Sequence, residues 1–294
     1  MWDVIDLSGA IPVSTEVAGL KTKRWFLSST KEEWLFKTHR PESHESVAEV
    51  LASRLALCVA VPALEYKLAV DKGVDGCVSS LVAGIQSGKQ LLARVDDKYQ
   101  VEAKYRNEDH TINLIADVLL QIAPSDGVTT CTTALGQFLG YVMFDAWIVN
   151  TDRHHENWGY IETPSGRKLA ASYDHGSAFA WRESDDKLLR RLETTDAGFS
   201  AAHFLSKSKS ALYADDINGG KRKLLLLDAA ILVAVHCKRE EVCAWVAQFS
   251  DVNWGHVDAI VNDTPQHIMS GVRKRWVMQI LRTNHARLLK VVKC

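Results

Sequence analysis

The chain has 294 residues, of which 47% are hydrophobic and 24% are charged, and its formal net charge at pH 7 is -1. A chain of this length and composition can bury a large core, which is typical of a globular protein rather than a disordered one. The near-neutral charge, without a strongly basic region, argues against binding to a nucleic-acid backbone as the main function.

The first strong pattern in the chain is a β-hairpin. Residues 23–37 contain two aromatic-rich runs on either side of a turn rich in Ser, Thr and Lys, which is the pattern of two paired strands. The preceding residues, 16–23, include one Gly and two Lys and are interpreted as a short loop. The sequence therefore predicts a loop followed by a hairpin near the N-terminus.

A helix and two further strands follow the hairpin. Residues 44–61 carry apolar side chains at helical spacing and predict a helix that Pro62 ends. Strand-like runs follow at 63–70 and 75–83. We therefore expect residues 1–84 to form a small lobe, a phosphate-binding sheet with one helix.

The rest of the chain is mainly helical in pattern. Apolar residues at helical spacing predict helices at 111–123, 132–150, 221–249, 265–270 and 271–292. Two short strand-like runs lie at 157–163 and 168–174, and the charged run at 180–193 is expected to be exposed. We expect an α+β fold in which a larger helical lobe, 85–294, carries the catalytic loops, with the site between the lobes.

Targeting signals and cysteine spacing bear on location. The N-terminus lacks the basic and long apolar regions of a signal peptide, and no window of the chain is long and apolar enough to span a membrane. None of the six cysteines forms a CxxC pair, and most lie in apolar sequence. The interpretation is a cytoplasmic, reducing environment without structural disulfides.

A polar run, NTDRHHEN at 150–157, directly follows the apolar helix pattern. Asp152 and Asn157 are five residues apart, Asp174 follows seventeen residues later, and Gly176 is two residues further on. Protein kinases place a catalytic Asp, a metal-binding Asn and a second metal-binding Asp followed by Gly in this order. Mg²⁺ requires hard oxygen ligands, and a separate carboxylate must accept the hydroxyl proton. The pattern predicts Asp152 as the catalytic base, and Asn157 and Asp174 as metal ligands.

A lysine at the end of a strand run is the candidate phosphate anchor. Lys37 closes the run WLFK, as the lysine of the third strand does in protein kinases. Glu49 in the following helix is its expected partner, and Glu45, one turn earlier on the same helix face, is the alternative. Lys21 and Lys23 are placed to cover the phosphates, although this segment is not a GxGxxG loop.

The order of these motifs, from WLFK through a helix with Glu to NTDRHHEN and YDHGSAF, resembles the HipA-like kinases. These are bacterial Ser/Thr kinases, several of them toxins of toxin–antitoxin modules. The run DRHHEN also looks like the catalytic loop of the phosphatidylinositol 3-/4-kinases. The resemblance covers residues 19–181 and continues weakly to the C-terminus. We expect no counterpart of the additional N-terminal subdomain of HipA in this sequence.

This resemblance implies a two-lobed protein-kinase-like fold that uses ATP and Mg²⁺. The implied partners are a protein substrate with a Ser or Thr acceptor and an antitoxin protein, with no direct contact to nucleic acid. Two alternatives stay open: a lipid or small-molecule phosphotransferase of the same fold, and a pseudokinase that serves as a binding module.

The residues around the predicted base leave further alternatives. His154 is expected to orient Asp152, and a direct catalytic part stays open because the corresponding His of lipid kinases is sometimes given one. His155 is expected to be exposed, and Arg153 either to bind a phosphorylated residue or to pair with an acid. The candidates for a regulatory phosphorylation are Ser28, Ser29 and Thr30 in the hairpin turn.

Overall fold

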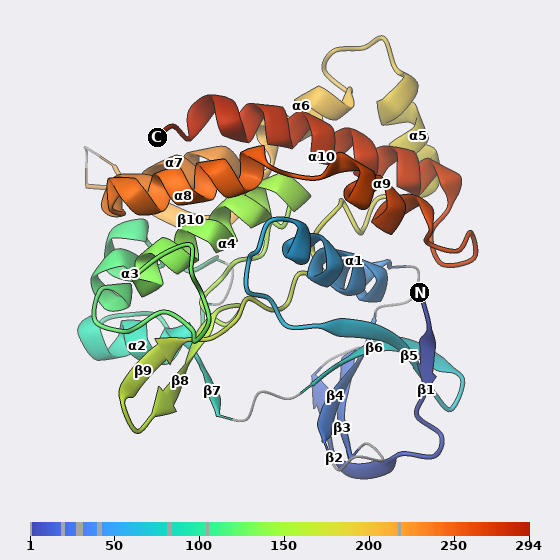
Figure 1. Cartoon of the computed structure of the whole chain (residues 1–294), viewed down its shortest axis with the longest axis horizontal. Helices are drawn as coiled ribbons and strands as arrows, with labels where there is room; N and C mark the ends of the chain where they lie inside the picture. The colour runs from blue at the N-terminus through green and yellow to red at the C-terminus, as the bar shows by residue number, and fades with distance from the viewer. Residues whose placement is uncertain are drawn as a thin grey trace.

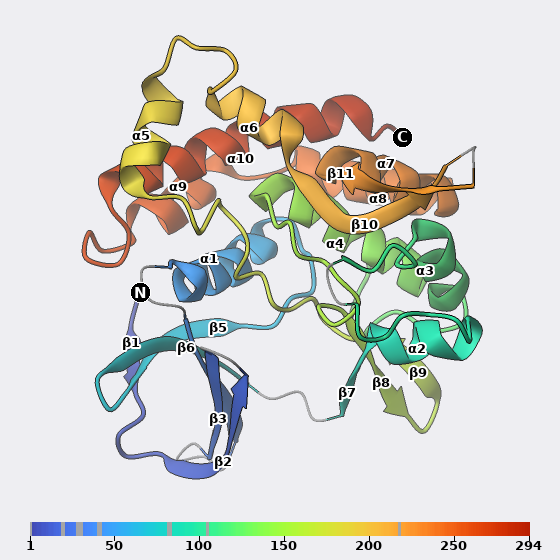
Figure 2. The same ribbon diagram turned by 180° about the vertical axis from the view of Figure 1, so that it is seen from behind.

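The computed structural model describes residues 2–18, 21–27, 32–39, 43–80, 84–103, 106–216 and 219–294. Its N-terminal part is a six-stranded sheet in the order β1-β5-β6-β4-β3-β2 (Figures 1 and 2). The strands are β1 Val4–Asp6, β2 Ile11–Ala18, β3 Lys21–Leu27, β4 Glu33–Thr38, β5 Tyr66–Asp71 and β6 Val74–Ser80. β1 pairs with β5 in parallel, and the other neighbouring strands are antiparallel.

The predicted hairpin is present as β3 and β4, in which Trp25 lies opposite Leu35. The predicted loop at 16–23 is wrong, because β2 continues to Ala18 and β3 already begins at Lys21. Ile11, Val13 and Thr15 favour a strand, and pairing with β3 satisfies the backbone groups of β2. The sheet therefore extends one hairpin further than the sequence indicated.

Helix α1, Glu45–Cys58, lies between the sheet and the helical part of the molecule (Figure 1). It packs against β5 and β6 on one side and against a later helix, α9, on the other. The predicted helix is present but ends at Cys58, because the chain turns away through Ala60, whose φ is 49°, before Pro62 is reached. The left-handed backbone at Ala60 is incompatible with a continuing right-handed helix, so the helix ends before the proline.

Helix α4, Ala134–Ile148, is the centre of the helical part, and all fifteen of its residues are buried. A helix that is apolar on every side is expected in a core, and the predicted helix at 132–150 is confirmed. It packs against α3, α7, α8 and α10. Gly140 permits the approach of α8, because a Cβ atom at this position would clash with the ring of Trp245.

The remaining elements surround α4. The helices are α2 Gly88–Val95, α3 Ile112–Leu119, α5 Asp185–Glu193, α6 Ala201–Lys207, α7 Leu226–His236, α8 Arg239–Ser250, α9 Trp254–Asn262 and α10 Gly271–Val291. An antiparallel sheet contains β7 Ile85–Ser87, β8 Gly159–Thr163 and β9 Gly166–Leu169. A separate hairpin contains β10 Lys209–Asp215 and β11 Lys221–Leu225.

Several predictions for this half of the chain need correction. Residues 221–225 form β11 rather than the start of a helix, because they pair with β10, and such tertiary pairing overrides weak local preferences. Residues 265–270 form a turn, and the helix at 254–262 was not predicted. The strand predicted at 168–174 ends at Leu169.

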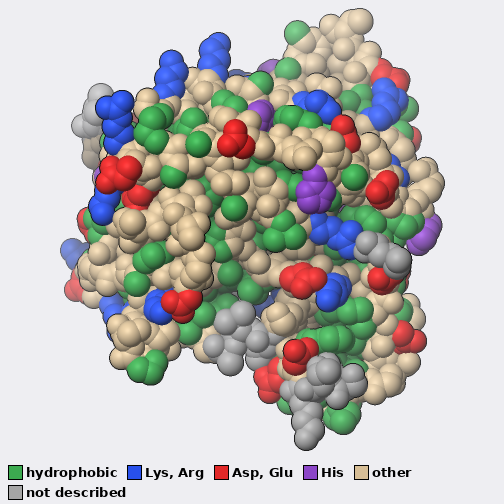
Figure 3. All heavy atoms as spheres, viewed as in Figure 1, with side chains coloured by type: hydrophobic (Ala, Val, Ile, Leu, Met, Phe, Trp, Pro, Cys, Tyr) green, Lys and Arg blue, Asp and Glu red, His purple; other side chains and the backbone are tan. Residues whose placement is uncertain are grey.

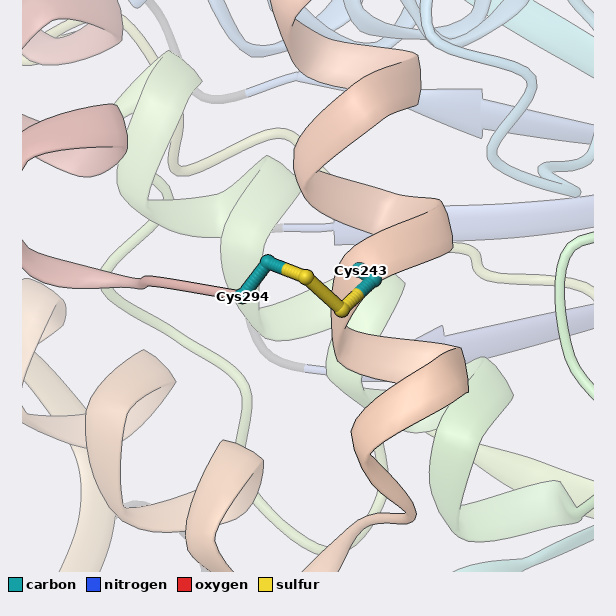
Figure 4. The surroundings of a disulfide bond; sticks show 2 residues. All are labelled: Cys243 and Cys294. Atoms are coloured by element: carbon teal, nitrogen blue, oxygen red, sulfur yellow. A yellow bond between two sulfur atoms is a disulfide. The ribbon is translucent and has the colours of Figure 1, made fainter.

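The expectation of no structural disulfide is also wrong. Cys243 of α8 is bonded to Cys294 near the end of α10 (Figure 4). The two cysteines are 51 residues apart, so no short spacing motif could have indicated the bond. The other four cysteines, Cys58, Cys77, Cys131 and Cys237, are free thiols.

Helix length, helix polarity and surface charge are the features that concern a possible membrane location. Within the described residues, every helix is too short or too polar to cross a membrane. On the face seen in Figure 3, basic and acidic side chains are interspersed, as the near-neutral net charge suggests. The cytoplasmic location inferred from the sequence stays a prediction.

Candidate functional site

Three elements that are distant in the sequence bring a lysine and two carboxylates together. The Nζ atom of Lys37, on β4, lies 3.6 Å from Oε1 of Glu49 on α1 and 3.5 Å from Oδ1 of Asp174, which follows β9. Lys37 also donates to the hydroxyl oxygen of Tyr66, at 3.3 Å. The cluster therefore joins the sheet, α1 and the helical part at one point.

The alternation of side chains along β4 explains why Lys37 faces this cluster. Phe36 is fully buried in a small core on one face of the sheet, so the next side chain projects from the opposite face, toward α1. There the structure places Glu49, one of the two partners expected from the sequence, beside the ammonium group. The other, Glu45, is also buried on α1.

The charged groups of the cluster are strongly coupled. Burial lowers the pKa of Lys37, but Asp174, Tyr66 and Glu49 outweigh it and raise this pKa well above its usual value. Burial raises the pKa of Glu49 to about 8, opposed by Lys37 and reinforced by Asp174. The pKa of Glu49 therefore lies near neutral pH, and a cation bound beside it would favour its charged form.

Asp174 has an unusual backbone conformation. Its φ is 61°, in the left-handed region that side chains other than Gly rarely adopt. The next peptide N–H, that of His175, donates to Oε2 of Glu49 at 2.7 Å and so helps to hold this conformation. The Asp174 side chain is 42% exposed, which leaves its carboxylate accessible to a ligand.

The predicted base, Asp152, lies in an irregular loop after α4. Its side chain is 36% exposed, with Nε2 of His154 3.8 Å from Oδ1. The hydroxyl of Ser177 donates to Oδ2 of Asp152 at 3.4 Å. His154 is itself mostly buried, and its orienting role stays a prediction.

The predicted metal ligand Asn157 helps to close this loop. Its side-chain Nδ2 donates to the carbonyl oxygen of Asp152 at 2.6 Å, and its backbone N–H donates to the carbonyl oxygen of His154. Only the oxygen of its amide can bind a hard cation. The loop geometry therefore holds Asn157 and Asp152 in a fixed relation.

A buried ion pair between Arg153 and Asp145 supports this loop. The sequence pattern did not single out Asp145. Arg153 forms two hydrogen bonds of 2.7 Å to the carboxylate of Asp145 on α4, and both side chains are almost fully buried. Its NH1 group donates to the carbonyl oxygens of Asn157 and Tyr173, at 2.6 and 3.3 Å. Of the two roles considered for Arg153, pairing with an acid is the one that the structure contains. A signal existed, because Asp145 is the only charged residue in the helix.

His155 is fully buried, so the expectation that it is exposed is wrong. Its Nδ1 atom lies 2.7 Å from the hydroxyl oxygen of Tyr99 and 3.4 Å from Nδ2 of Asn107. Its ring also contacts the ring of His110. The chain turns inward at His155 because these groups supply polar partners that a short sequence pattern does not reveal.

The buried side chain of His110 should make the stability of the folded protein depend on pH. Burial lowers the pKa of His110 from 6.5 to about 3, although the hydrogen bond with the carbonyl oxygen of Ala211 opposes this. The unfolded state takes up this proton below pH 6.5 while the folded state does not, so stability falls as the pH falls from 6.5 toward 3. From pH 7 to pH 5 we expect His110 to cost roughly 2 kcal/mol.

This dependence can be measured by urea unfolding at several pH values in the wild type and in His110→Asn. The Asn side chain keeps a donor and an acceptor but does not titrate, so the variant should lose less stability on acidification. An identical loss in both proteins would contradict the role of His110.

Of the two lysines predicted to cover the phosphates, only Lys23 has a described side chain. Lys23 lies directly opposite Lys37 in the β3–β4 pair, so both side chains project from the same face of the sheet. Lys21 begins β3, and its side chain lies outside the described residues, as do the phosphorylation candidates Ser28, Ser29 and Thr30.

Comparison with known proteins identifies one matching family profile and several similar folds. The profile of the HipA-like C-terminal domain matches residues 15–224. The Helicobacter pylori proinflammatory kinase CtkA superposes with a TM-score of 0.76 at 15% identity, over 99% of this chain and 97% of CtkA. HipA from the Shewanella oneidensis HipA–HipB–operator DNA complex gives a TM-score of 0.59 at 15% identity, over 96% of this chain and 66% of HipA. Both likenesses are in fold, and no curated protein sequence matches the chain.

Proposed function

The chain belongs to the family of HipA-like C-terminal domains, and from this we propose that it is an ATP- and Mg²⁺-dependent kinase that phosphorylates a Ser or Thr of a protein. Its fold, a β-sheet followed by a mainly helical part, is the kinase-like fold of CtkA and HipA. The family and the fold support phosphoryl transfer in general. The choice of a protein hydroxyl as acceptor is the finer part of the proposal.

The observation that carries the proposal is the meeting of Lys37, Glu49 and Asp174 at one point of the fold. We assign the phosphates of ATP to Lys37, whose position Glu49 stabilises. Asp152 accepts the proton of the acceptor hydroxyl, and His154 orients its carboxylate. Transfer forms a bond between the acceptor oxygen and the γ-phosphorus of ATP, breaks the bond from this phosphorus to the bridging oxygen, and releases ADP.

The residues present fit a magnesium site. Asn157 and Asp174 offer an amide and a carboxylate oxygen, the hard ligands that Mg²⁺ prefers, and the phosphates and water would complete the coordination. When bound, Mg²⁺ neutralises phosphate charge during transfer.

We propose residues 1–84 as the nucleotide-phosphate lobe and 85–294 as the lobe with the catalytic loops. In support, residues up to Ser80 form the six-stranded sheet and α1, whereas β7, from Ile85, pairs with β8 in the other part of the molecule. The lysine of the cluster then comes from the first lobe and the carboxylate of Asp174 from the second.

We further propose that the chain acts as a toxin that a separate antitoxin protein restrains. The support is that the similar HipA was solved in a toxin–antitoxin complex with HipB. Expression of the wild type in a bacterial host should then arrest growth, and expression of Asp152→Asn should not. Equal growth with both proteins at equal levels would contradict the toxin role.

Thermal unfolding with ATP and Mg²⁺ tests nucleotide binding directly. A ligand that binds only the folded state at a hundred times its Kd stabilises that state by about 2.7 kcal/mol. For a chain of this size we expect a rise in Tm of roughly 5 °C. Asp174→Asn should lose most of this rise, because its neutral amide binds the cation weakly while still tolerating the left-handed backbone.

The matched control is Asp117→Asn, an exposed Asp on α3 that is not part of the cluster. This variant should keep the full rise. An Mg²⁺-dependent rise that survives in Asp174→Asn would move the metal site elsewhere, and no rise in the wild type would favour the pseudokinase alternative.

A further inference from the structure

A cavity of about 430 Å³ opens beside the loop that carries Asp152. Thr151, the residue before Asp152, lines it, and so does Ser177, whose hydroxyl donates to the Asp152 carboxylate. Its other walls come from the segment that includes α5 and α6, seen at the upper left of Figure 2. The cavity therefore adjoins the proposed catalytic base through Thr151 and Ser177.

Aromatic rings and a stacked arginine form the inner wall of this cavity. Trp181, Phe199 and Phe204 line it. The guanidinium group of Arg191 lies 4.6 Å from the ring centre of Phe199 and 4.9 Å from that of Phe204. The Nε–H of Arg191 is buried and finds no hydrogen-bond acceptor within the described residues, so a donor at this wall is unsatisfied.

The charged groups at the rim are mainly cations. Arg182, stacked on Trp181, and Lys207 are exposed, and within the described residues neither forms an ion pair with a carboxylate. Glu183 is the one carboxylate among the described lining residues, and Lys187 and Arg191 already pair with it, at 2.7 and 3.7 Å. The cavity therefore presents positive charge without a matching acid.

The positive charge continues from the cavity toward the hairpin of β10 and β11. Burial lowers the pKa of Lys223, Asp152 raises it, and Lys209 and Arg106 lower it further. Lys223 therefore lies within electrostatic range of the proposed base and of two further cations. In a chain with a net charge of -1, such a concentration beside the site favours an anionic ligand.

We propose that this cavity binds the acceptor segment of the substrate, and that the segment carries Asp or Glu next to the Ser or Thr that is phosphorylated. The inference rests on the proposed function, because it places the acceptor hydroxyl at Asp152. Carboxylates of the segment pair with Arg182 and Lys207, and the aromatic wall takes an adjoining side chain. Electrostatic complementarity of this kind selects one partner among many.

A peptide suits this cavity better than a lipid headgroup at a membrane. The aromatic side chains of Trp181, Phe199 and Phe204 line the cavity. The exposed large hydrophobic residues among those described lie on other elements: Val4, Ile11, Val13, Leu57, Val74, Val95, Leu120, Val235 and Val291. The mouth thus lacks the apolar rim that would insert into a bilayer.

Peptide binding without nucleotide tests the cavity independently of catalysis. A fluorescein-labelled short peptide with one Ser flanked by Glu is compared, by anisotropy, with the same peptide carrying Gln at these positions. The wild type should prefer the acidic peptide. The double variant Arg182→Gln/Lys207→Gln should bind it roughly tenfold more weakly, the sum of two exposed ion pairs. Lys98→Gln, an exposed lysine outside the cavity, is the matched control and should bind as the wild type does.

Equal affinity for both peptides, or a preference that survives in the double variant, would overturn the inference. Displacement of the acidic peptide by an inositol phosphate at lower concentration would overturn it in favour of a lipid headgroup. Addition of ATP and Mg²⁺ then separates the two proposals. Binding of the acidic peptide without phosphate transfer would count against the kinase function, while the charge preference of the cavity would stand.

Discussion

Replacement of Asp152 by Asn is expected to lower the rate of phosphoryl transfer about 10²-fold or more, because an amide cannot accept the proton of the acceptor hydroxyl. The change is isosteric, and the side chain is partly exposed, so the fold should persist. Initial rates with labelled ATP, at saturating nucleotide and acceptor, measure the effect. Nucleotide-dependent stabilisation should be retained, which separates a loss of chemistry from a loss of binding.

His154 provides the companion experiment. If His154 orients the Asp152 carboxylate, His154→Gln should lower kcat by less than Asp152→Asn and change the pH profile of kcat while leaving KM for ATP unchanged. Asp126→Asn, in an exposed loop and paired with Lys168, is a matched carboxylate control and should keep the wild-type rate. Near-normal transfer by Asp152→Asn would remove Asp152 from the role of base.

Removal of Arg153 is expected to have the largest effect on stability. Arg153→Met should lower the free energy of unfolding by about 3–5 kcal/mol, because it leaves the carboxylate of Asp145 buried without its partner. The variant also loses the hydrogen bonds to the carbonyl oxygens of Asn157 and Tyr173, so the loop that carries the proposed ligands should loosen. Urea unfolding of the wild type and the variant gives the difference.

A double variant distinguishes the effect of an unpaired buried charge on stability from the effect of lost packing. Arg153→Met/Asp145→Leu removes both charges, so it should recover part of the lost stability, and the two changes should be strongly non-additive. It should not recover phosphoryl transfer, since the loop still lacks its hydrogen bonds. A loss below about 1 kcal/mol in Arg153→Met would contradict the supporting role of the pair, since breaking a buried pair normally costs several kcal/mol.

Local spacing in the sequence predicted the parts of the site that lie on one continuous segment. Asp152 and Asn157 occupy one loop, and a hydrogen bond from the side chain of Asn157 to the backbone of Asp152 closes it. The helix before this loop was predicted for a similar reason, since a long apolar run at helical length is a strong signal of a buried helix. The hairpin of β3 and β4 belongs to the same class, because only a few residues separate its strands in the sequence.

The same reasoning proposed Lys37, Glu49 and Asp174 by their order along the chain, but it did not place them. Lys37 and Asp174 are 137 residues apart, and their contact depends on how α1 packs between the sheet and the helical part. The choice between Glu45 and Glu49 also needed this packing, because both lie on one face of the helix. Order along the chain suggests a shared site, whereas distances belong to the fold.

The sequence by itself thus determined the central helix and the Asp152–Asn157 motif, because these depend on neighbours a few positions apart. The order of the motifs along the chain determined the family resemblance. Only the tertiary structure decided that Arg153 pairs with Asp145, that His155 is buried beside Tyr99, and that β11 is a strand. The same holds for the bond between Cys243 and Cys294. These features depend on burial and on partners that packing supplies, and a polar or sulfur-bearing side chain shows its role only when those partners are in place.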